Sequence, residues 1–305
     1  MRNSFKAELK MWFHTGRIIV TLGVLLGADV FFTALGISSI EEKIKAFTFS
    51  INMISSDTEI YRILQEPLIY EDGSVNAVLK NKMDIEMTLH ALSPHNALLF
   101  CTEVGFYLFP VIMTILGAQA VCQEYSTGVM RVRVSREGKW KYFVAKQTVM
   151  ILVAIGLISM ATLLYRIGSK FFFDIAKKHA YLKYIDTSEG NYSDTGNILY
   201  LVLFFALCII IFLEIGFSIG YLFKSSIIPS AIVGFLWFIN IIPLDYGPKN
   251  AIYNVANRLS RFDGFVPNGM VSVITNFSAS IVIVITLMLP LIVAFFTWNK
   301  RSFYK

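Results

Sequence analysis

Six long apolar runs, separated by polar segments, dominate the pattern of this chain. The runs are Ile18–Ile37, Ala97–Cys122, Gln147–Tyr165, Asn197–Phe223, Ile227–Ile242 and, approximately, Phe277–Trp298. A helix needs about 20 mainly apolar residues to cross the hydrocarbon core of a bilayer. The pattern therefore predicts an all-α integral membrane protein with six transmembrane helices, forming a single domain over residues 1–305.

The first 16 residues have a different, two-sided pattern. Apolar residues recur at helical spacing: Phe5, Leu9, Trp12 and Phe13. Basic residues repeat every four positions: Arg2, Lys6 and Lys10. A helix with one apolar and one basic stripe is typical of a segment that lies on the membrane surface. We therefore predict an amphipathic interfacial helix over residues 1–16; the alternative is a charged tail that only sets the topology.

Two polar inserts interrupt the apolar runs and predict structure outside the membrane. In the insert 38–96, Ser39 and Glu42 have the spacing of a capping box, and Asp72-Gly73 indicates a turn. In the insert 243–276, Pro248 is suited to begin a helix that Gly264 would end. Such a helix either shapes a pore exit or only caps the bundle.

Composition and charge agree with a membrane protein and set its orientation. The chain is 55% hydrophobic and 16% charged, with a mean hydropathy of +0.61, too apolar for a soluble core of this length. The net charge of +6 comes from cations beside the apolar runs and not from a nucleic-acid motif, so we expect no nucleic-acid partner. Cations concentrate in the short loops that the model of six spans places inside. Both termini are therefore expected in the cytoplasm.

The segment 123–146 is the most basic of these loops, with six Lys or Arg against two acids. Because it joins two predicted spans, the positive-inside rule assigns it to the cytoplasm. Its residues Val129–Val134 alternate as a strand would, so periodicity alone does not establish a helix there. One interpretation is a contact site for a partner; the other is a loop whose cations only fix the topology.

The chain lacks the motifs of several enzyme classes. It has no G-x4-G-K-[ST] motif to hold nucleotide phosphates and no H-E-x-x-H. The pattern G-x-S-x-G occurs at Gly216–Gly220, but inside a long apolar run and not at the strand-to-helix turn that a serine hydrolase requires. Its four histidines are scattered, and its three cysteines have no metal-ligand spacing. We therefore predict no catalytic residue, no metal site and no cofactor held by this chain.

Three acidic residues lie inside the predicted spans: Asp29, Glu103 and Glu214. A carboxylate at membrane depth is costly, so it should face protein, water or a partner. Glu103 lies near the outer end of its span, where it is either a residue at headgroup level or a part of a transport path, and the first is favoured. Asp29 and Glu214 lie deeper, and each is either a structural hydrogen-bonding group or a polar residue of a translocation path.

These features together resemble the ABC-2 type permease subunits of bacterial ABC exporters. The resemblance rests on the amphipathic N-terminus, the six spans and the helical insert before the last span. Its sharpest part is the cytoplasmic pattern E-x3-G, followed by a basic stretch and a lysine entering the third span: Glu124, Gly128, Arg131, Arg136 and Lys146. The 59-residue outer insert is longer than in many relatives, and a Leu-x-Pro-type element is absent from the basic stretch.

The resemblance implies a transport subunit without its own ATPase site. Residues 124–139 would contain a coupling helix that docks on a separate ATP-binding subunit, with ATP and Mg bound by that partner, and Glu124, Gly128, Arg131 and Arg136 would serve coupling. It further implies a second permease subunit, surrounding membrane lipids, the bacterial cytoplasmic membrane, and outward movement of a peptide, antibiotic or lipid-like compound.

A different class of function is also compatible with the residues. An ion- or proton-coupled secondary transporter would use the acids within the spans. Such transporters often contain internal repeats, and the halves 1–150 and 151–305 show none that is convincing. That interpretation also leaves the basic loop 123–146 without a role.

Overall fold

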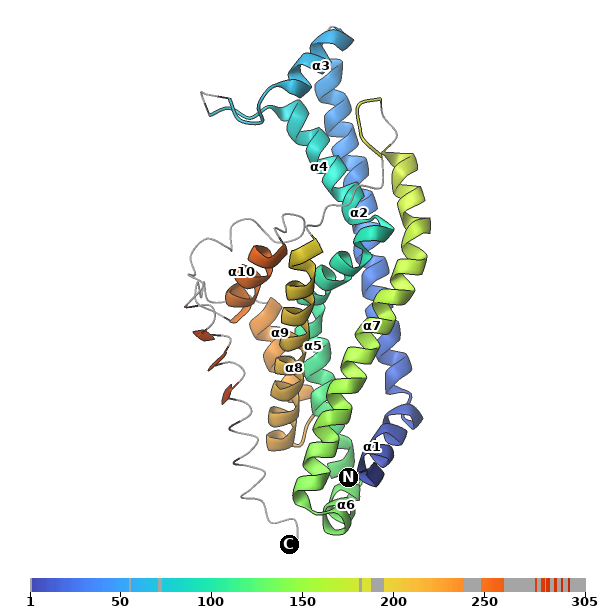
Figure 1. The fold of residues 1–305 in the computed structure, drawn as a ribbon, viewed down its shortest axis with the longest axis vertical. Helices are drawn as coiled ribbons and strands as arrows, with labels where there is room; N and C mark the ends of the chain where they lie inside the picture. The colour runs from blue at the N-terminus through green and yellow to red at the C-terminus, as the bar shows by residue number, and fades with distance from the viewer. Residues whose placement is uncertain are drawn as a thin grey trace. The chain divides into compact units, whose positions relative to one another are not determined.

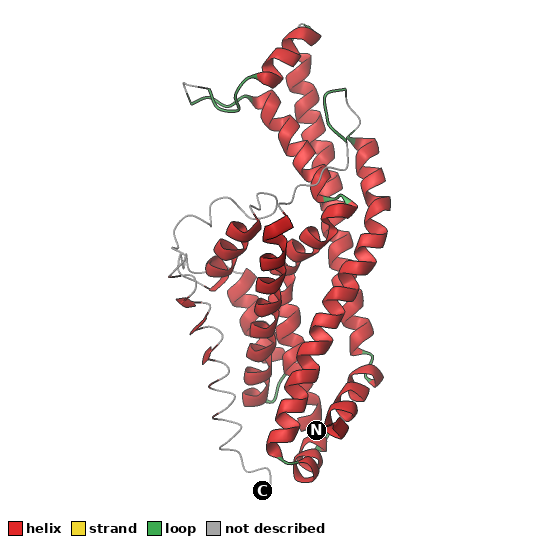
Figure 2. Cartoon of the chain, in the orientation of Figure 1, coloured by secondary structure: helices red, strands yellow, loops and turns green. Residues whose placement is uncertain are grey.

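The structure, a computed structural model, is built from helices over the part of the chain that it describes (Figures 1 and 2). It describes residues 2–54, 56–70, 73–180, 183–187, 195–238 and 248–260, and a few helical positions between 278 and 296. The helices are α1 (Arg2–His14), α2 (Arg17–Asn52), α3 (Asp57–Gln65), α4 (Ala77–Ala91), α5 (Ala97–Ser126), α6 (Val129–Glu137), α7 (Lys139–His179), α8 (Thr195–Phe223), α9 (Ile227–Phe238) and α10 (Pro248–Ser260), with a 3₁₀ turn, η1, at Pro94–Asn96.

The chain divides into two compact units. Unit 1 comprises Met1–Leu25, Thr102–Ala161 and Asp194–Lys305, and unit 2 comprises Leu26–Cys101 and Thr162–Ser193. Helices α2, α5 and α7 therefore each contribute residues to both units.

Within unit 1, α5 and α8 approach so closely that only glycine fits at several positions. A Cβ atom added at Gly117 of α5 would lie 2.1 Å from the carbonyl oxygen of Leu213, and one at Gly216 of α8 would lie 2.1 Å from that of Thr114. Gly216 and Gly220 have the G-x-x-x-G spacing that lets membrane helices pack backbone to backbone. The close packing fixes α8 against α5 at membrane depth.

Helix α10 is hydrogen-bonded to α5 at a backbone carbonyl that a proline leaves without a helical partner. Pro110 lies inside α5 and has no backbone N–H, so the carbonyl of Phe106, four residues earlier, has no helical partner. The buried hydroxyl of Tyr253 in α10 donates to that carbonyl at 3.4 Å. Pro248 begins α10, as the sequence predicted, while Gly264 lies outside the described residues.

Unit 2 has a small core of its own. Ile40 and Phe47 of α2 are fully buried, as are Ile85 and Leu89 of α4. Lys43 of α2 adds a polar contact, because its Nζ donates to Thr88 Oγ1 at 2.7 Å and to the Asp84 carbonyl at 3.2 Å. The predicted outer insert 38–96 lies wholly in this unit.

Two details of that insert differ from the prediction or refine it. Ser39 and Glu42 do not start a helix, because α2 continues through them to Asn52, well beyond the apolar run that ends at Ile37. The turn prediction is supported at Gly73, which has φ of +81° beside an antiparallel bridge between Ile69 and Val75. Asp72 lies outside the described residues.

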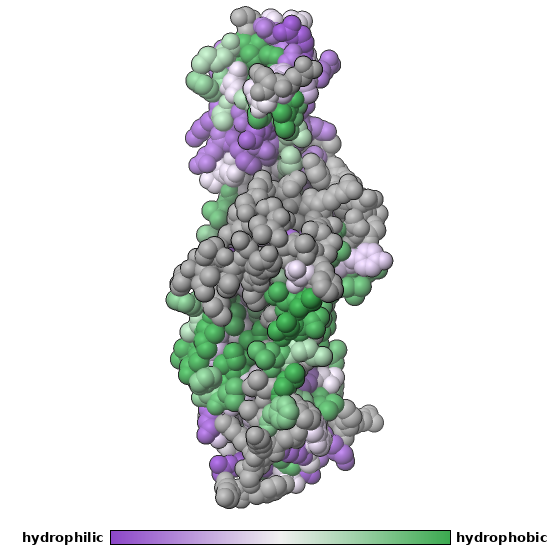
Figure 3. All heavy atoms as spheres, turned by 90° about the vertical axis from the view of Figure 1, so that its left-hand side faces the viewer, coloured by the Kyte–Doolittle hydropathy of each residue, from purple (hydrophilic) through white to green (hydrophobic). Residues whose placement is uncertain are grey.

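Four of the described helices are long and apolar enough to cross a membrane: Arg17–Asn52, Pro94–Ser126, Lys139–His179 and Leu199–Phe223. They contain the first three predicted spans and all but the first two residues of the fourth. Many of their apolar side chains are exposed in unit 1, where Figure 3 shows a green apolar area above a hydrophilic end. Of the fifth predicted span, Ile227–Ile242, the structure describes the 12 residues of α9. The sixth, 277–298, lies almost entirely outside the described residues. The chain is thus an all-α protein with several candidate membrane spans.

Candidate functional site

The predicted cytoplasmic segment 123–146 contains a short helix, α6, between two glycines. Gly128 precedes α6 with φ of +72°, and Gly138 follows it with φ of +83°. Both values lie in the left-handed region that side chains other than glycine rarely adopt. The chain therefore turns sharply at each end of α6. Despite their strand-like alternation, Val129–Val134 lie within this helix.

Helix α6 has one buried and one exposed side. Met130 and Val134, one helical turn apart, are 2% and 1% exposed. Arg131 and Arg136 are exposed, as are Val129 and Val132, at 41% and 55%. The outer side of α6 therefore presents two arginines beside apolar side chains.

A cluster of buried charges attaches α6 to three other helices. Arg133 Nη1 donates to Glu8 Oε2 at 2.5 Å and to Glu124 Oε1 at 2.7 Å. Lys146 Nζ lies 3.1 Å from Glu8 Oε1 and 3.0 Å from Glu124 Oε2. The Tyr142 hydroxyl also donates to Glu124. This buried charge cluster joins α1, α5, α6 and α7.

The charges of the cluster compensate one another. Glu8, Glu124 and Lys146 are at most 1% exposed, and Arg133 is 13% exposed. Burial alone would lower the pKa of Arg133, but the hydrogen bond to Glu8 and the charges of Glu124 and Glu8 raise it above the ordinary arginine value, so the guanidinium stays charged. Because breaking a buried pair leaves an uncompensated charge, these helices resist separation.

The structure gives different environments to the four predicted coupling residues. Glu124 belongs to the buried charge cluster, and Gly128 forms the turn before α6. A Cβ at Gly128 would meet no atom within 4 Å, so the turn, and not a close backbone approach within this chain, requires glycine there. Arg131 and Arg136 point to the exposed side of α6.

Of the four charges in the cluster, the sequence analysis singles out Glu124 and Lys146 but not Glu8 or Arg133. Glu8 is the single acid in a basic helix. Glu8 and Lys146 are 138 positions apart in the chain, and only the fold brings them together. An acid inside a basic amphipathic helix was the available signal.

The three acids in the spans are not part of this cluster. Asp29 and Glu214 are 5% and 4% exposed, and Glu214 accepts a hydrogen bond from Gln147 Nε2 at 3.1 Å. Asp29 belongs to unit 2, whereas Glu103 and Glu214 belong to unit 1. The ion pairs found among the described residues include none of the three, and those residues contain no group of three His, Cys, Asp or Glu able to hold a metal.

No family model, curated protein or solved structure matches this chain.

Proposed function

We propose that this chain is the membrane-spanning subunit of an ATP-driven exporter of the ABC-2 permease type. In this proposal it has six spans, lies in the bacterial cytoplasmic membrane with both termini in the cytoplasm, and acts beside a second permease subunit. A separate subunit binds ATP and Mg, and the compound moved outward is a peptide, an antibiotic or a lipid-like molecule.

The observation that carries the proposal is that α6 is fixed to the helices on both sides of it and to α1. A docking helix transmits motion only if it moves as a rigid body with the spans behind it. Helix α6 lies between the ends of α5 and α7, and the buried charge cluster connects it to both and to α1. Its exposed side, with Val132, Arg131 and Arg136, provides apolar and basic contacts for a partner surface.

Pull-down from native membranes tests the partner. Full-length chain extracted in mild detergent should retain a protein with a phosphate-binding loop and ATPase activity, and the chain alone should hydrolyse no ATP. The variant Val132→Asp/Arg136→Glu should lower the retained ATPase at least about tenfold, because the loss of a hot-spot residue at the centre of an interface costs about 2 kcal/mol or more.

The matched control is Arg62→Glu on α3, which also reverses an exposed positive charge, at 71% side-chain exposure. It should leave the retained ATPase unchanged. ATP hydrolysis by the purified chain alone, or equal retention by the α6 variant and the wild type, would contradict the proposal.

Because two acids are buried in candidate spans, a secondary transporter is the second candidate function. Asp29 and Glu214 are buried inside candidate spans, and the ion pairs found among the described residues include neither. Ionisable residues at such positions often mark ion or proton pathways. Transport assays in vesicles separate the two functions. An exporter stops when ATP is removed, whereas a secondary transporter stops when the ion gradient collapses at constant ATP.

A further inference from the structure

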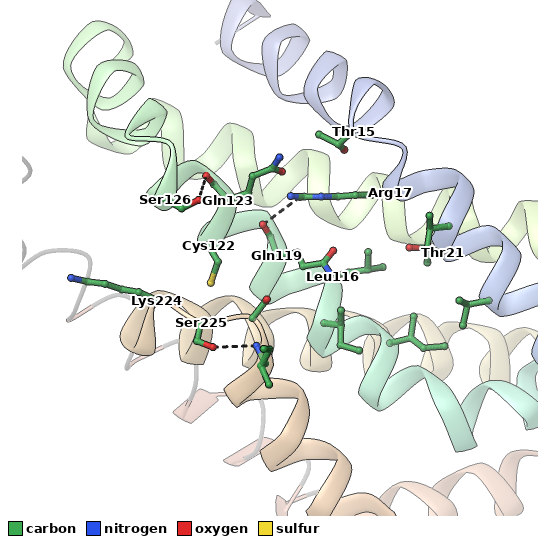
Figure 4. A pocket seen from close by; sticks show the side chains of 16 residues that line it. Thr15, Arg17, Thr21, Leu116, Gln119, Cys122, Gln123, Ser126, Lys224 and Ser225 are labelled. Carbon is green, nitrogen blue, oxygen red and sulfur yellow. Dashed lines mark hydrogen bonds between the residues drawn. The ribbon is translucent and has the colours of Figure 1, made fainter.

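A cavity of about 780 Å³ lies in unit 1, where the start of α2, the end of α5 and the α8–α9 turn meet (Figure 4). Its size is within the range of ligand-binding pockets. It is distinct from the buried charge cluster, since none of Glu8, Glu124, Arg133 and Lys146 lines it.

The two charged side chains among the lining residues are both cations. Arg17 extends from the start of α2 toward α5, where its Nη1 donates to the Gln119 carbonyl at 3.3 Å (Figure 4). Lys224 comes from the α8–α9 turn, and its Nζ lies 4.7 Å from the centre of the Tyr125 ring. No Asp or Glu is among the described residues that line the cavity, although the charges of Glu124 and Glu8 act on Arg17 from outside the lining. A negatively charged ligand would complement the two cations of the lining.

The hydroxyl group of Ser225, next to Lys224 in the chain, also lines the cavity and can hydrogen-bond to a ligand. Ser225 Oγ accepts from the backbone N–H of Ile227, which leaves the serine proton to donate to a ligand. Lys224 has φ of +55°, a left-handed value, and it is the one positive-φ residue other than glycine among those described. Strained backbone of this kind occurs often at binding sites.

The cavity changes from polar to apolar in the same direction on two helices. Along α2, Arg17 comes first, and the half-exposed Val24 follows two turns later, about 10 Å along the axis. Along α5, Gln123 lies near the helix end, and Ile112 lies about three turns deeper. A charged mouth above an apolar wall matches the head-to-tail polarity of an amphiphile.

We propose that this cavity binds an anionic phospholipid of the inner leaflet, with Arg17, Lys224 and Ser225 holding the headgroup phosphate and the apolar wall holding an acyl chain. The charged mouth lies at the end of α5 that leads to α6, which the positive-inside rule assigns to the cytoplasm. Anionic lipids are concentrated in that leaflet. The inference rests on the membrane location and on the proposed cytoplasmic side of α6, and not on the proposed transport role.

Titration of the delipidated full-length chain in a neutral detergent tests the proposal. The probes are dioctanoyl phosphatidylglycerol, dioctanoyl phosphatidylcholine and glycerol phosphate, and bound ligand is counted by native mass spectrometry alongside the rise in melting temperature. Phosphatidylglycerol should bind at least about tenfold more tightly than either of the others. Equal binding of phosphatidylcholine would remove the role of charge, and equal binding of glycerol phosphate would show a free-anion site; either result overturns the proposal.

Substitutions of the two cations in the cavity then test whether the lipid binds there. Lys224→Gln should weaken phosphatidylglycerol binding by roughly fivefold, and Arg17→Gln/Lys224→Gln by roughly 25-fold, as expected for two cations near a phosphate. Arg166→Gln/Lys170→Gln removes two exposed cations of α7 outside the cavity and should bind like the wild type. Because Lys224 is exposed, its single variant remains informative if the loss of the Arg17 contact impairs folding. Wild-type affinity in Lys224→Gln, or an equal loss in the control, overturns the assignment.

Discussion

At the residue scale, Gly128 and Gly138 decide where the connection between α5 and α7 turns. Both have positive φ, and a Cβ at either position would meet no atom within 4 Å. The requirement for glycine is therefore conformational and not steric. The same two residues separate α6 from its neighbours, so the length of the exposed helix depends on them.

Replacing Gly128 should change stability through backbone strain alone. Gly128→Val places a β-branched residue in the left-handed region and should cost about 1–2 kcal/mol, whereas Gly128→Asn should cost less because asparagine tolerates that region. Melting temperatures of the purified variants measure the difference, and pull-down measures partner binding. Equal melting temperatures for the valine and asparagine variants would show that strain at this turn is unimportant.

At the element scale, the buried charge cluster joins one short helix to three others. Glu8 is the contribution of α1, and both Arg133 and Lys146 depend on it. Without Glu8, Lys146 would keep Glu124 as its ion-pair partner, and Arg133 would share that carboxylate while keeping Glu137, 3.5 Å from its Nε. The N-terminal helix is thus part of the α5–α6–α7 assembly and more than a topological signal.

Double substitution tests this arrangement. Glu8→Gln should destabilise the chain by about 3–5 kcal/mol, and Lys146→Met by a similar amount, because each leaves a buried charge uncompensated. The double variant should be less destabilised than the sum of the two, since it removes one charge of each sign. Denaturation of the full-length chain in detergent gives the four free energies, with Glu42→Gln, an exposed acid on α2, as control. Additive effects, or single variants as stable as the control, would contradict the coupling of these charges.

At the scale of the whole molecule, the orientation in the membrane determines what each unit can contact. Charge sorting predicts α6 in the cytoplasm and the insert 38–96, which belongs to unit 2, outside the cell. In that predicted orientation the mouth of the cavity would lie near the inner leaflet.

Thiol labelling in intact cells checks this orientation. In a variant without its three native cysteines, Ser74→Cys should react with a membrane-impermeant maleimide, and Ser135→Cys on α6 should react only after the cells are opened. Both serines are exposed, so accessibility within the protein does not limit either reaction. Labelling of Ser135→Cys from outside would reverse the topology and exclude a cytoplasmic partner for α6.

The sequence by itself determined the features that depend on neighbouring residues. Apolar runs located the first four spans, because crossing a bilayer requires about 20 consecutive apolar residues whatever their neighbours in space. Pro248 marked the start of α10 for a similar local reason, because proline has no N–H to lose at the first turn of a helix. The capping box at Ser39 and Glu42 predicted a new helix, whereas α2 continues through these residues to Asn52. The helical end of α7 beyond Tyr165 was not predicted, since that part of the chain mixes polar and apolar residues and acquires its packing partners only in the fold.

Only the tertiary structure decided which distant residues meet. Glu8, Glu124, Arg133 and Lys146 carry no local signal of pairing, because salt bridges depend on distances of a few ångströms between side chains on four helices. The close approach of Gly216 in α8 to Thr114 in α5 was also decided by the fold, because a glycine in an apolar run does not reveal which backbone it approaches. Local chemistry sets helices and membrane crossings, and packing sets the sites that they form together.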